Sequence, residues 1–286
     1  MDGIILIDKP KDYTSHDVVA VIKKIGKEKV GHTGTLDPNA TGVLPLLIGK
    51  ATGISKYLIN HDKTYIATLK LGIKTDTADG EGKVLEEKEV PYFEIEDIQK
   101  ALNKLIGKQE QVPPMYSAIK VNGKKLYEYA RQGKEIEVQA RTIEIYDIKL
   151  IEFNKEEAEI VFEVSCSKGT YIRTVCEKVA DNLNTFGYMK ELRRIRVGEF
   201  DIQDTVSIEY IKNNPELLEE NTITIEKFFE SKEQIELNDK ELELFLNGVK
   251  LSKDNKNEIY RVYNNNKFIG LGIVEDKKLK RDIIIN

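Results

Sequence analysis

Two stretches of the chain alternate apolar and polar residues so regularly that they constrain its fold more than any other feature. Residues 65–71 and 160–166 place an apolar side chain at every second position, which is typical of a strand with one buried face. Apolar residues three and four apart predict helices over residues 18–25, 98–106 and 172–183. Strands and helices mix without a regular βαβ alternation, so the pattern favours an α+β fold over a doubly wound sheet.

Shorter signals add further elements. Apolar runs predict three more strands, at residues 4–7, at 143–150 with a bulge, and at 195–202. Thr14 or Ser15 is expected to cap the first helix, and Gly26 to end it. These elements together are enough to build a sizeable core in a chain of 286 residues.

The composition changes after about Val206. Residues 207–234 are charged and predict helical pieces without a strong strand. A small unit then follows, with a helix at 240–247 and the segment EIYRVYNNNKFIGLGIV, which predicts two strands joined by an asparagine-rich turn. We therefore assign a main domain to residues 1–232 and a small β-rich domain to residues 233–286, which is too short to bury much surface alone and should pack on the main body.

The charge pattern is compatible with a polyanionic partner in spite of a formal net charge of −5. Net charge alone argues against nucleic acid, because phosphate affinity comes from lysine and arginine. Basic residues nevertheless cluster at residues 120–125, 168–178 and 190–196. A charge run usually marks a solvated face, but three clusters close to small polar motifs favour a local basic groove.

The cysteines and the apolar runs bear on the compartment. Cys166 and Cys176 fit no metal-binding or redox spacing, so we expect reduced core residues in a cytoplasmic protein. Apolar runs fall short of the ~20 residues that span a bilayer, and the first residues lack the pattern of a secretory signal. The expectation is a cytoplasmic chain without a membrane span.

Familiar ligand and catalytic motifs fail on their spacing. Six residues separate Gly42 from Gly49, and Ala51 follows Lys50, so a phosphate loop is rejected. In the stretch DTADGEG, an EF-hand would need Asp or Asn where Ala78 stands. The three histidines match neither a serine triad nor a zinc site. The chemistry should therefore rest on carboxylate, tyrosine, arginine or lysine, without a metal or cofactor.

One carboxylate stands out in the motif GHTGTLDPNATG, residues 31–42. Asp37 lies among glycines, which permit unusual dihedral angles, and Pro38 pushes it into an extended conformation. Taken alone, Asp37 would cap a turn. Arg173, where a strand meets a helix in CSKGTYIRT, could keep such a carboxylate ionised or could lie on a helix surface. Tyr65 and Tyr171 could be core aromatics or flat faces for a flipped base.

The motifs together resemble the TruB family of tRNA pseudouridine synthases. Segments in the family's order and spacing cover roughly residues 2–205, namely GIILIDKPKDYTSHDVV, GHTGTLDPNATGVLPLLIGKAT, DKTYIATLKLGIKTDTADGEG, QVPPMYSAIKVNGKKLYEYARQG, CSKGTYIRT and LRRIRVGEF. The resemblance implies the pseudouridine synthase fold for residues 1–232, a mixed, mainly antiparallel sheet flanked by helices. The tail beyond about residue 235 resembles a shortened PUA-like RNA-binding domain.

The resemblance also implies a site. The family's catalytic aspartate falls on Asp37, and the arginine that pairs with it falls on Arg173. Tyr65 matches the tyrosine that stacks on the target base and is a candidate base in the reaction. Two further positions match the substrate pocket, and one matches the histidine that enters the RNA loop when the uridine leaves; they are Tyr171, Leu192 and His32.

The implied reaction converts uridine 55 in the T stem-loop of tRNA to pseudouridine, with base flipping and no cofactor. Asp37 would attack C1′ or C6, or abstract a sugar proton. The implied enzyme is a monomer without an obligate protein partner. Two alternatives stay open, a tRNA-folding chaperone, alone or combined with catalysis, and ribosomal RNA modification within a nucleoprotein particle. The short tail without a long basic extension favours the stand-alone bacterial type.

Overall fold

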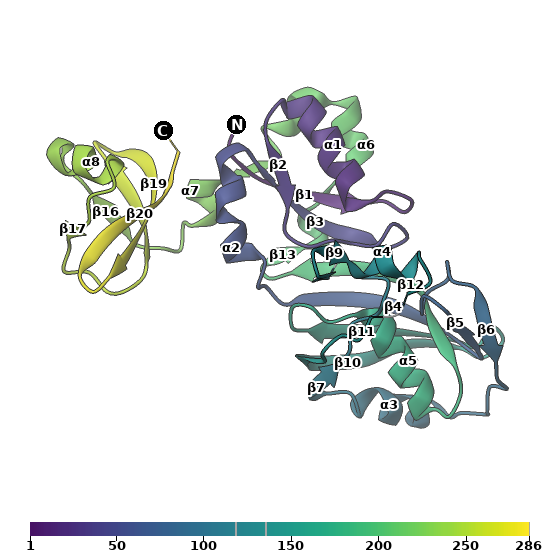
Figure 1. Ribbon diagram of the computed structural model, residues 1–286. Helices are drawn as coiled ribbons and strands as arrows, with labels where there is room; N and C mark the ends of the chain where they lie inside the picture. Colours follow the sequence, from purple (N-terminus) through teal and green to yellow (C-terminus); the bar gives the residue numbers. More distant parts are fainter. Residues whose placement is uncertain (118, 135, 286) are drawn as a thin grey trace. The chain divides into compact units, whose positions relative to one another are not determined.

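The computed structural model describes residues 1–117, 119–134 and 136–285 (Figure 1). Residue 118, within the QVPPMYSAIK motif, and residue 286, at the end of the predicted small domain, lie outside the described residues. The chain divides into two compact units. Unit 1 holds Met1–Pro38, Leu44–Ile59 and Gln203–Asn286, and unit 2 holds Asn39–Val43 and Asn60–Ile202.

Unit 1 contains a small sheet with short helices, and its strands follow the order β14–β1–β3, with β15 on β1 and β2 on β3. The strands are β1 (Gly3–Lys9), β2 (Val30–His32), β3 (Thr41–Ile48, which begins in unit 2), β14 (Val206–Ser207) and β15 (Thr222–Thr224). The helices are α1 (Ser15–Gly26), α2 (Ser55–Leu58), α6 (Ile208–Asn213) and α7 (Ile225–Phe228), with 3-10 turns η1 (Gly49–Ile54), η2 (Ile202–Asp204) and η3 (Pro215–Leu218).

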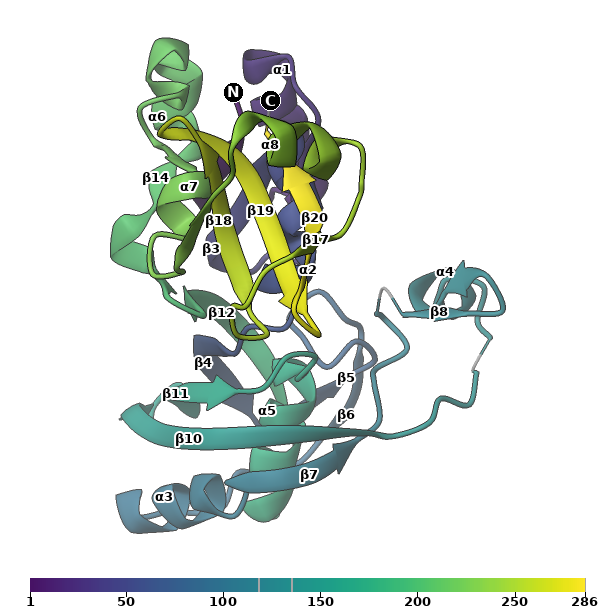
Figure 2. The ribbon, with the colours of Figure 1, turned by 90° about the vertical axis from the view of Figure 1, so that its left-hand side faces the viewer.

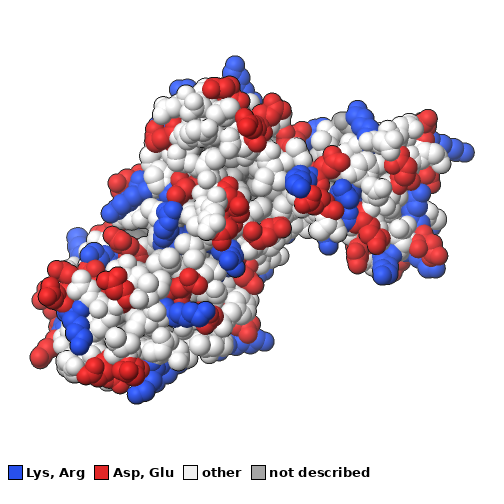
Figure 3. All heavy atoms as spheres, turned by 180° about the vertical axis from the view of Figure 1, so that it is seen from behind, with Lys and Arg blue, Asp and Glu red and all other residues white. Residues whose placement is uncertain are grey.

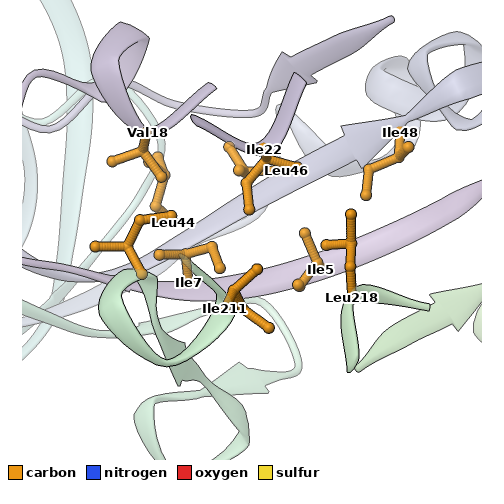
Figure 4. Close-up of a cluster of buried hydrophobic side chains, with 10 residues drawn as sticks. Ile5, Ile7, Val18, Ile22, Leu44, Leu46, Ile48, Ile211 and Leu218 are labelled. Carbon is orange, nitrogen blue, oxygen red and sulfur yellow. The ribbon is translucent and has the colours of Figure 1, made fainter. Parts of the chain in front are cut away.

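Helix α1 begins where the sequence predicts. The Thr14 side chain accepts from the backbone N–H of Asp17 at 3.1 Å, and the Asp17 carboxylate accepts from the Thr14 N–H at 2.8 Å, which is a reciprocal capping box. The predicted end is confirmed, since α1 ends at Gly26, and Lys27 after it takes the left-handed conformation, with φ of 55°. The apolar face of α1 packs into the buried cluster of Figure 4, formed by Ile5, Ile7, Val18, Ile22, Leu44, Leu46, Ile48, Ile208, Ile211 and Leu218.

A separate five-stranded sheet ends the chain, in the order β16–β18–β19–β20–β17. It consists of β16 (Gln234–Glu236), β17 (Leu251–Ser252), β18 (Ile259–Asn264), β19 (Lys267–Glu275) and β20 (Lys278–Ile284), with helix α8 (Asp239–Leu246). The predicted hairpin is confirmed, since Asn265 and Asn266 both have positive φ between antiparallel β18 and β19, as a two-residue turn requires. The β-rich character of this part of the chain is confirmed as well.

The terminal sheet contacts the rest of unit 1 through Asp282 in β20. Its carboxylate accepts a hydrogen bond from the Tyr57 hydroxyl at 2.5 Å and pairs with Lys56, both in α2. Burial and the bond to Asp282 raise the pKa of the Tyr57 phenol. The terminal sheet and α2 of the same unit are thus joined by a polar contact, and the packing of the tail on the main body stays a prediction.

Unit 2 is built on a twisted sheet in the order β12–β4–β11–β10–β7, in which every neighbouring pair is antiparallel. Its strands are β4 (Lys63–Leu71), β5 (Ile73–Thr75), β6 (Val84–Glu87), β7 (Gly107–Gln111), β8 (Lys120–Val121), β9 (Lys124–Lys125), β10 (Arg141–Asn154), β11 (Glu159–Cys166), β12 (Gly187–Val197) and β13 (Phe200–Asp201). Its helices are α3 (Ile95–Asn103), α4 (Leu126–Ala130) and α5 (Ile172–Asn182). In Figure 2 the segment with β8 and α4 extends away from this sheet.

The two alternating stretches, residues 65–71 and 160–166, lie in the neighbouring strands β4 and β11 of this sheet. Every odd residue of β4 from Lys63 to Leu71 is buried. Strand β10 carries the expected irregularity, with register shifts near Ile145 and Leu150. The strand predicted at 195–202 is wrong in its bounds, because β12 already begins at Gly187 and ends at Val197. A turn at Gly198, where φ is 56°, separates it from β13.

The remaining predictions from composition concern the two cysteines, a membrane span and the surface charge. Cys166 and Cys176 are free and buried, as expected, and burial raises the pKa of the Cys166 thiol to about 11. Within the described residues, no helix is both long and apolar enough to cross a bilayer. On the face shown in Figure 3, acidic and basic side chains are interspersed, so the basic groove stays a prediction.

Candidate active site

The predicted site residues are distributed over both units. His32 and Asp37 lie in unit 1, and Tyr65, Tyr171, Arg173 and Leu192 lie in unit 2. Within each unit, contacts with neighbouring residues hold the predicted side chains in place. The assembly of the two halves into one site stays a prediction.

The Asp37 loop is held on its N-terminal side by a buried hydroxyl. Ser15, which is 1% exposed at the start of α1, accepts from the Leu36 N–H at 2.9 Å and donates to the Leu36 carbonyl at 3.2 Å. Both polar backbone groups of the residue before Asp37 are therefore bonded to one side chain. Such a pair fixes the backbone of a loop that has neither helix nor strand hydrogen bonds.

The C-terminal side of the same loop is held by Lys9, which is fully buried at the end of β1. Its ammonium donates to the carbonyls of Pro10 at 2.9 Å, Tyr13 at 2.5 Å and Pro38 at 2.9 Å. An ammonium has three donors, and here all three are used, which makes its burial tolerable. The Pro38 carbonyl also accepts from the Asp12 N–H at 3.0 Å. Asp37, itself half-buried, thus sits between two anchored residues.

We expect Ser15→Ala to lower the single-turnover rate by more than its loss of unfolding free energy explains. The change leaves the buried polar groups of Leu36 without their partner, which costs about 1–3 kcal/mol of unfolding free energy and loosens Asp37. The control is Ser207→Ala, since Ser207 caps α6 by accepting from the Tyr210 N–H at 3.1 Å and lies outside the loop. Urea unfolding and single-turnover assays should show a similar stability loss in both and a rate loss in Ser15→Ala alone. Equal rates in the two variants would contradict the anchoring role.

His32 is oriented by its own turn and by a second histidine. Its Nδ1 accepts from the Gly34 N–H at 3.3 Å, so the neutral ring carries its proton on Nε2. The His16 ring of α1 meets the His32 ring edge to face, with centroids 5.4 Å apart. The half-buried His32 side chain therefore starts from a defined position.

In unit 2, Tyr65 and Leu192 share one face of the sheet. Tyr65 lies in β4, is 8% exposed and stands opposite Arg194 of β12. Leu192 stands opposite Ala67 and is 9% exposed. Paired residues of antiparallel strands point to the same face, so the sheet itself fixes the spacing of Tyr65 and Leu192.

Arg173 is buried in the first turn of α5, where a positive charge is unfavourable to the helix dipole. Its guanidinium is held by acceptors from two loops. It donates to the Thr77 carbonyl at 3.2 Å, to the Tyr116 carbonyl at 2.7 Å and to the Asp79 carboxylate at 3.4 Å. The Asp79 side chain is 17% exposed, so this is a largely buried ion pair. The predicted pairing of Arg173 with Asp37 would join the two units and stays a prediction.

Tyr171 is the N-cap residue of α5 and is tied to β7 by Gln111. The Gln111 side chain, 3% exposed, accepts from the Tyr171 N–H at 2.8 Å and donates to the Tyr171 carbonyl at 3.1 Å. This amide pair sets the direction in which α5 begins. It thereby positions Arg173, two residues further on.

Sequence reasoning missed four supporting residues, Lys9, Ser15, Asp79 and Gln111. All four lie in or beside the matched motifs, as in IDKP and TSHD, but their residue types are common on surfaces. The missing signal is burial of a polar side chain beside a functional loop, which periodicity alone does not reveal. Among the described residues, no group of three or more His, Cys, Asp or Glu side chains could hold a metal ion.

Family models match most of the chain. The model of the TruB family pseudouridylate synthase N-terminal domain covers residues 23–172. The tRNA pseudouridylate synthase B C-terminal domain covers residues 173–235, and the C-terminal model of pseudouridine synthase II TruB covers residues 234–280. The three matches follow one another without a gap, and the last two overlap at residues 234–235.

Curated relatives are similar over nearly their whole length. The tRNA pseudouridine synthase B of Clostridium kluyveri is 44% identical over 98% of both chains, and that of Clostridium tetani is 45% identical over 95% of both. Among solved structures, a Cbf5-Nop10-Gar1 complex contains a chain 25% identical to this one, with a TM-score of 0.69 over 99% of this chain and 83% of that chain.

Proposed function

The chain belongs to the TruB family of pseudouridylate synthases, and we propose on that basis that it isomerises uridine 55 in the T loop of tRNA to pseudouridine. The observation that carries the proposal is the 44% identity to a tRNA pseudouridine synthase B over 98% of both chains. The loop geometry supports it, because Asp37 lies between two residues that buried side chains anchor.

In the proposed reaction the bond from ribose C1′ to uracil N1 breaks and a bond from C1′ to C5 forms. The uridine first leaves the loop, at a cost of a few kcal/mol for unstacking. His32 fills the space it leaves, and Tyr65 stacks on the extruded base. Asp37 then acts as nucleophile or base on the nucleotide, and Arg173 keeps its carboxylate ionised. After rotation of the base and closure to C5, the C5 proton is released and N1 takes up a proton, so the product is an isomer of uridine.

The rest of the pocket serves the same step. Tyr171 and Leu192 line the substrate pocket in this proposal, and enclosure excludes water from the freed sugar. Residues 1–232 form the catalytic domain, and residues 233–286 form a small PUA-like domain for RNA. We propose a cytoplasmic monomer that needs no protein partner and no cofactor.

The proposed function is tested by incubating an unmodified tRNA transcript with the protein and mapping pseudouridine by mass spectrometry. Conversion at position 55 is expected, and a transcript with cytidine at that position should stay unmodified. Absence of pseudouridine in the intact transcript would contradict the proposal. The chaperone role is tested separately, by asking whether Asp37→Asn still accelerates tRNA folding.

Tyr65→Phe is expected to keep tRNA binding and lose most of the rate. The ring remains available for stacking, but the hydroxyl is removed, and general acid–base groups contribute roughly 10²–10⁴-fold. Filter binding and release of tritium from uridine C5 measure the two quantities. Tyr188→Phe, on β12 of the same unit, is the control. Turnover equal to that of the unchanged chain would reduce Tyr65 to a packing role.

A further inference from the structure

A second arginine of unit 2 lies deeper than Arg173. Arg194, in β12, is 2% exposed and is among the largest fully buried side chains of the described chain. Arginine is almost never fully buried unless it is paired, and a buried charge is strongly destabilising unless neighbours hold it. The groups around Arg194 must therefore stabilise its charge, and they indicate its role.

The backbone around Arg194 is locked by three strands of the unit. Arg194 pairs with Tyr65 of β4 on one side and with Gly42, at the start of β3, on the other. Gly42 has φ of +106°, and a Cβ atom there would come within 2.1 Å of the Arg194 carbonyl oxygen, so no larger residue fits. Strand β12 cannot shift here without disturbing both neighbours.

The side chain is held at two points. Its Nε donates to the Val43 carbonyl at 2.8 Å, which fixes the plane of the guanidinium. Burial lowers the pKa of Arg194, while charge interaction and a side-chain hydrogen bond with Tyr65 raise it again. The interaction is reciprocal, since a cation that a phenolate stabilises also stabilises the phenolate.

We propose that Arg194 is a positioning residue for Tyr65, whose phenolic oxygen it holds in one place and whose anion it stabilises. The pairing of β12 with β4 places Arg194 beside Tyr65, and the hydrogen bond to the Val43 carbonyl orients the guanidinium. The inference rests on the proposed function for its catalytic meaning, because Tyr65 is a site residue there. The contact itself does not depend on that function.

Another charged group lies near Arg194 and Tyr65, and an experiment must separate its titration from that of Tyr65. Lys63, two residues before Tyr65 in β4, is 8% exposed. Burial, followed by the positive charges of Arg194 and Lys168, lowers its pKa to about 8, although Cys166 and Asp62 act in the opposite direction. Lys63 can therefore lose its proton within the pH range over which Tyr65 is titrated. For this reason the protonation state of Tyr65 has to be observed directly.

The direct test places 3-fluorotyrosine at position 65 of the full chain and follows its 19F NMR signal with pH. Arg194→Gln should raise the titration midpoint of Tyr65 by about one pH unit or more, and Arg194→Lys, which keeps the charge, should raise it less. The control is Arg196→Gln on the same strand, whose side chain is 59% exposed and pairs with Asp201. A midpoint that moves no further in Arg194→Gln than in Arg196→Gln would overturn the proposal.

A second measurement covers the case in which Arg194→Gln does not fold. Tyr65→Phe removes one oxygen atom, and 15N NMR of the arginine side chains then reports on Arg194. The Nε–H bonded to Val43 should stay protected from exchange, while the Nη protons should exchange at least about tenfold faster than in the unchanged chain. Unchanged Nη exchange would mean that Arg194 straps the strands and does not hold Tyr65. Neither experiment uses tRNA, so failure of the proposed function would appear separately in the mapping of pseudouridine.

Discussion

Asp37→Asn is expected to release essentially no tritium from tRNA labelled at C5 of uridine, a loss of roughly 10⁴-fold or more in single-turnover rate. The amide keeps the size of the side chain but can neither form the covalent link nor accept a proton as a carboxylate does. The loop should keep its shape, because Ser15 and Lys9 bond to backbone groups of Leu36 and Pro38. tRNA binding should therefore change little.

The control removes an equal charge elsewhere. Asp147→Asn lies in β10, where the carboxylate is 47% exposed and pairs with Lys149 at 2.6 Å. An exposed ion pair contributes at most about 1 kcal/mol, so this variant should turn over normally. If both variants retain normal turnover, Asp37 is not the catalytic carboxylate.

Arg173→Gln should combine a loss of rate with a loss of stability. The change leaves the Thr77 and Tyr116 carbonyls without their donor and Asp79 without its cation. Removing one partner of a buried pair costs about 3–5 kcal/mol. The rate should fall further than stability explains, because Asp37 loses the proposed counter-charge. Urea unfolding and single-turnover rates measured well below the unfolding midpoint separate the two effects.

Two comparisons make this prediction specific. Asp79→Asn keeps a hydrogen-bond acceptor for Arg173, so it should cost less stability than Arg173→Gln. Arg141→Gln removes an exposed arginine of β10 and should leave the unfolding free energy within about 0.5 kcal/mol of the unchanged value. A stability of Arg173→Gln equal to that of Arg141→Gln would show that the ion pair with Asp79 contributes nothing.

Regular elements were predictable because their signals are local. The period of two in residues 65–71 and the capping box at Thr14 each depend on residues within one turn or one strand. The hairpin at Asn265 and Asn266 follows from two residues that tolerate positive φ. The bounds of the elements were less predictable. Strand β12 begins at Gly187 because it pairs there with Leu71 of β4, and a contact between distant segments leaves no local signal.

The candidate site was predictable only through its motifs. Asp37 stood out as a lone carboxylate in a glycine-rich loop, but the catalytic roles of Asp37, Tyr65 and Arg173 came from a resemblance, and periodicity indicated none of these roles. Their supports depend on contacts between distant segments, such as Ser15 with Leu36 and Arg173 with Asp79. A single sequence does not encode such contacts as a pattern, because Ser, Lys and Asp are ordinary surface residues until the fold buries them.

The central claim is that Asp37 acts on the extruded nucleotide, and a crystal structure with a T stem-loop carrying 5-fluorouridine at position 55 tests it most directly. We expect the flipped nucleotide to stack on Tyr65, and the Asp37 carboxylate to be bonded to it or to lie about 3–3.5 Å from C1′ or C6. A flipped nucleotide whose sugar and base both lie beyond reach of Asp37 would contradict the account.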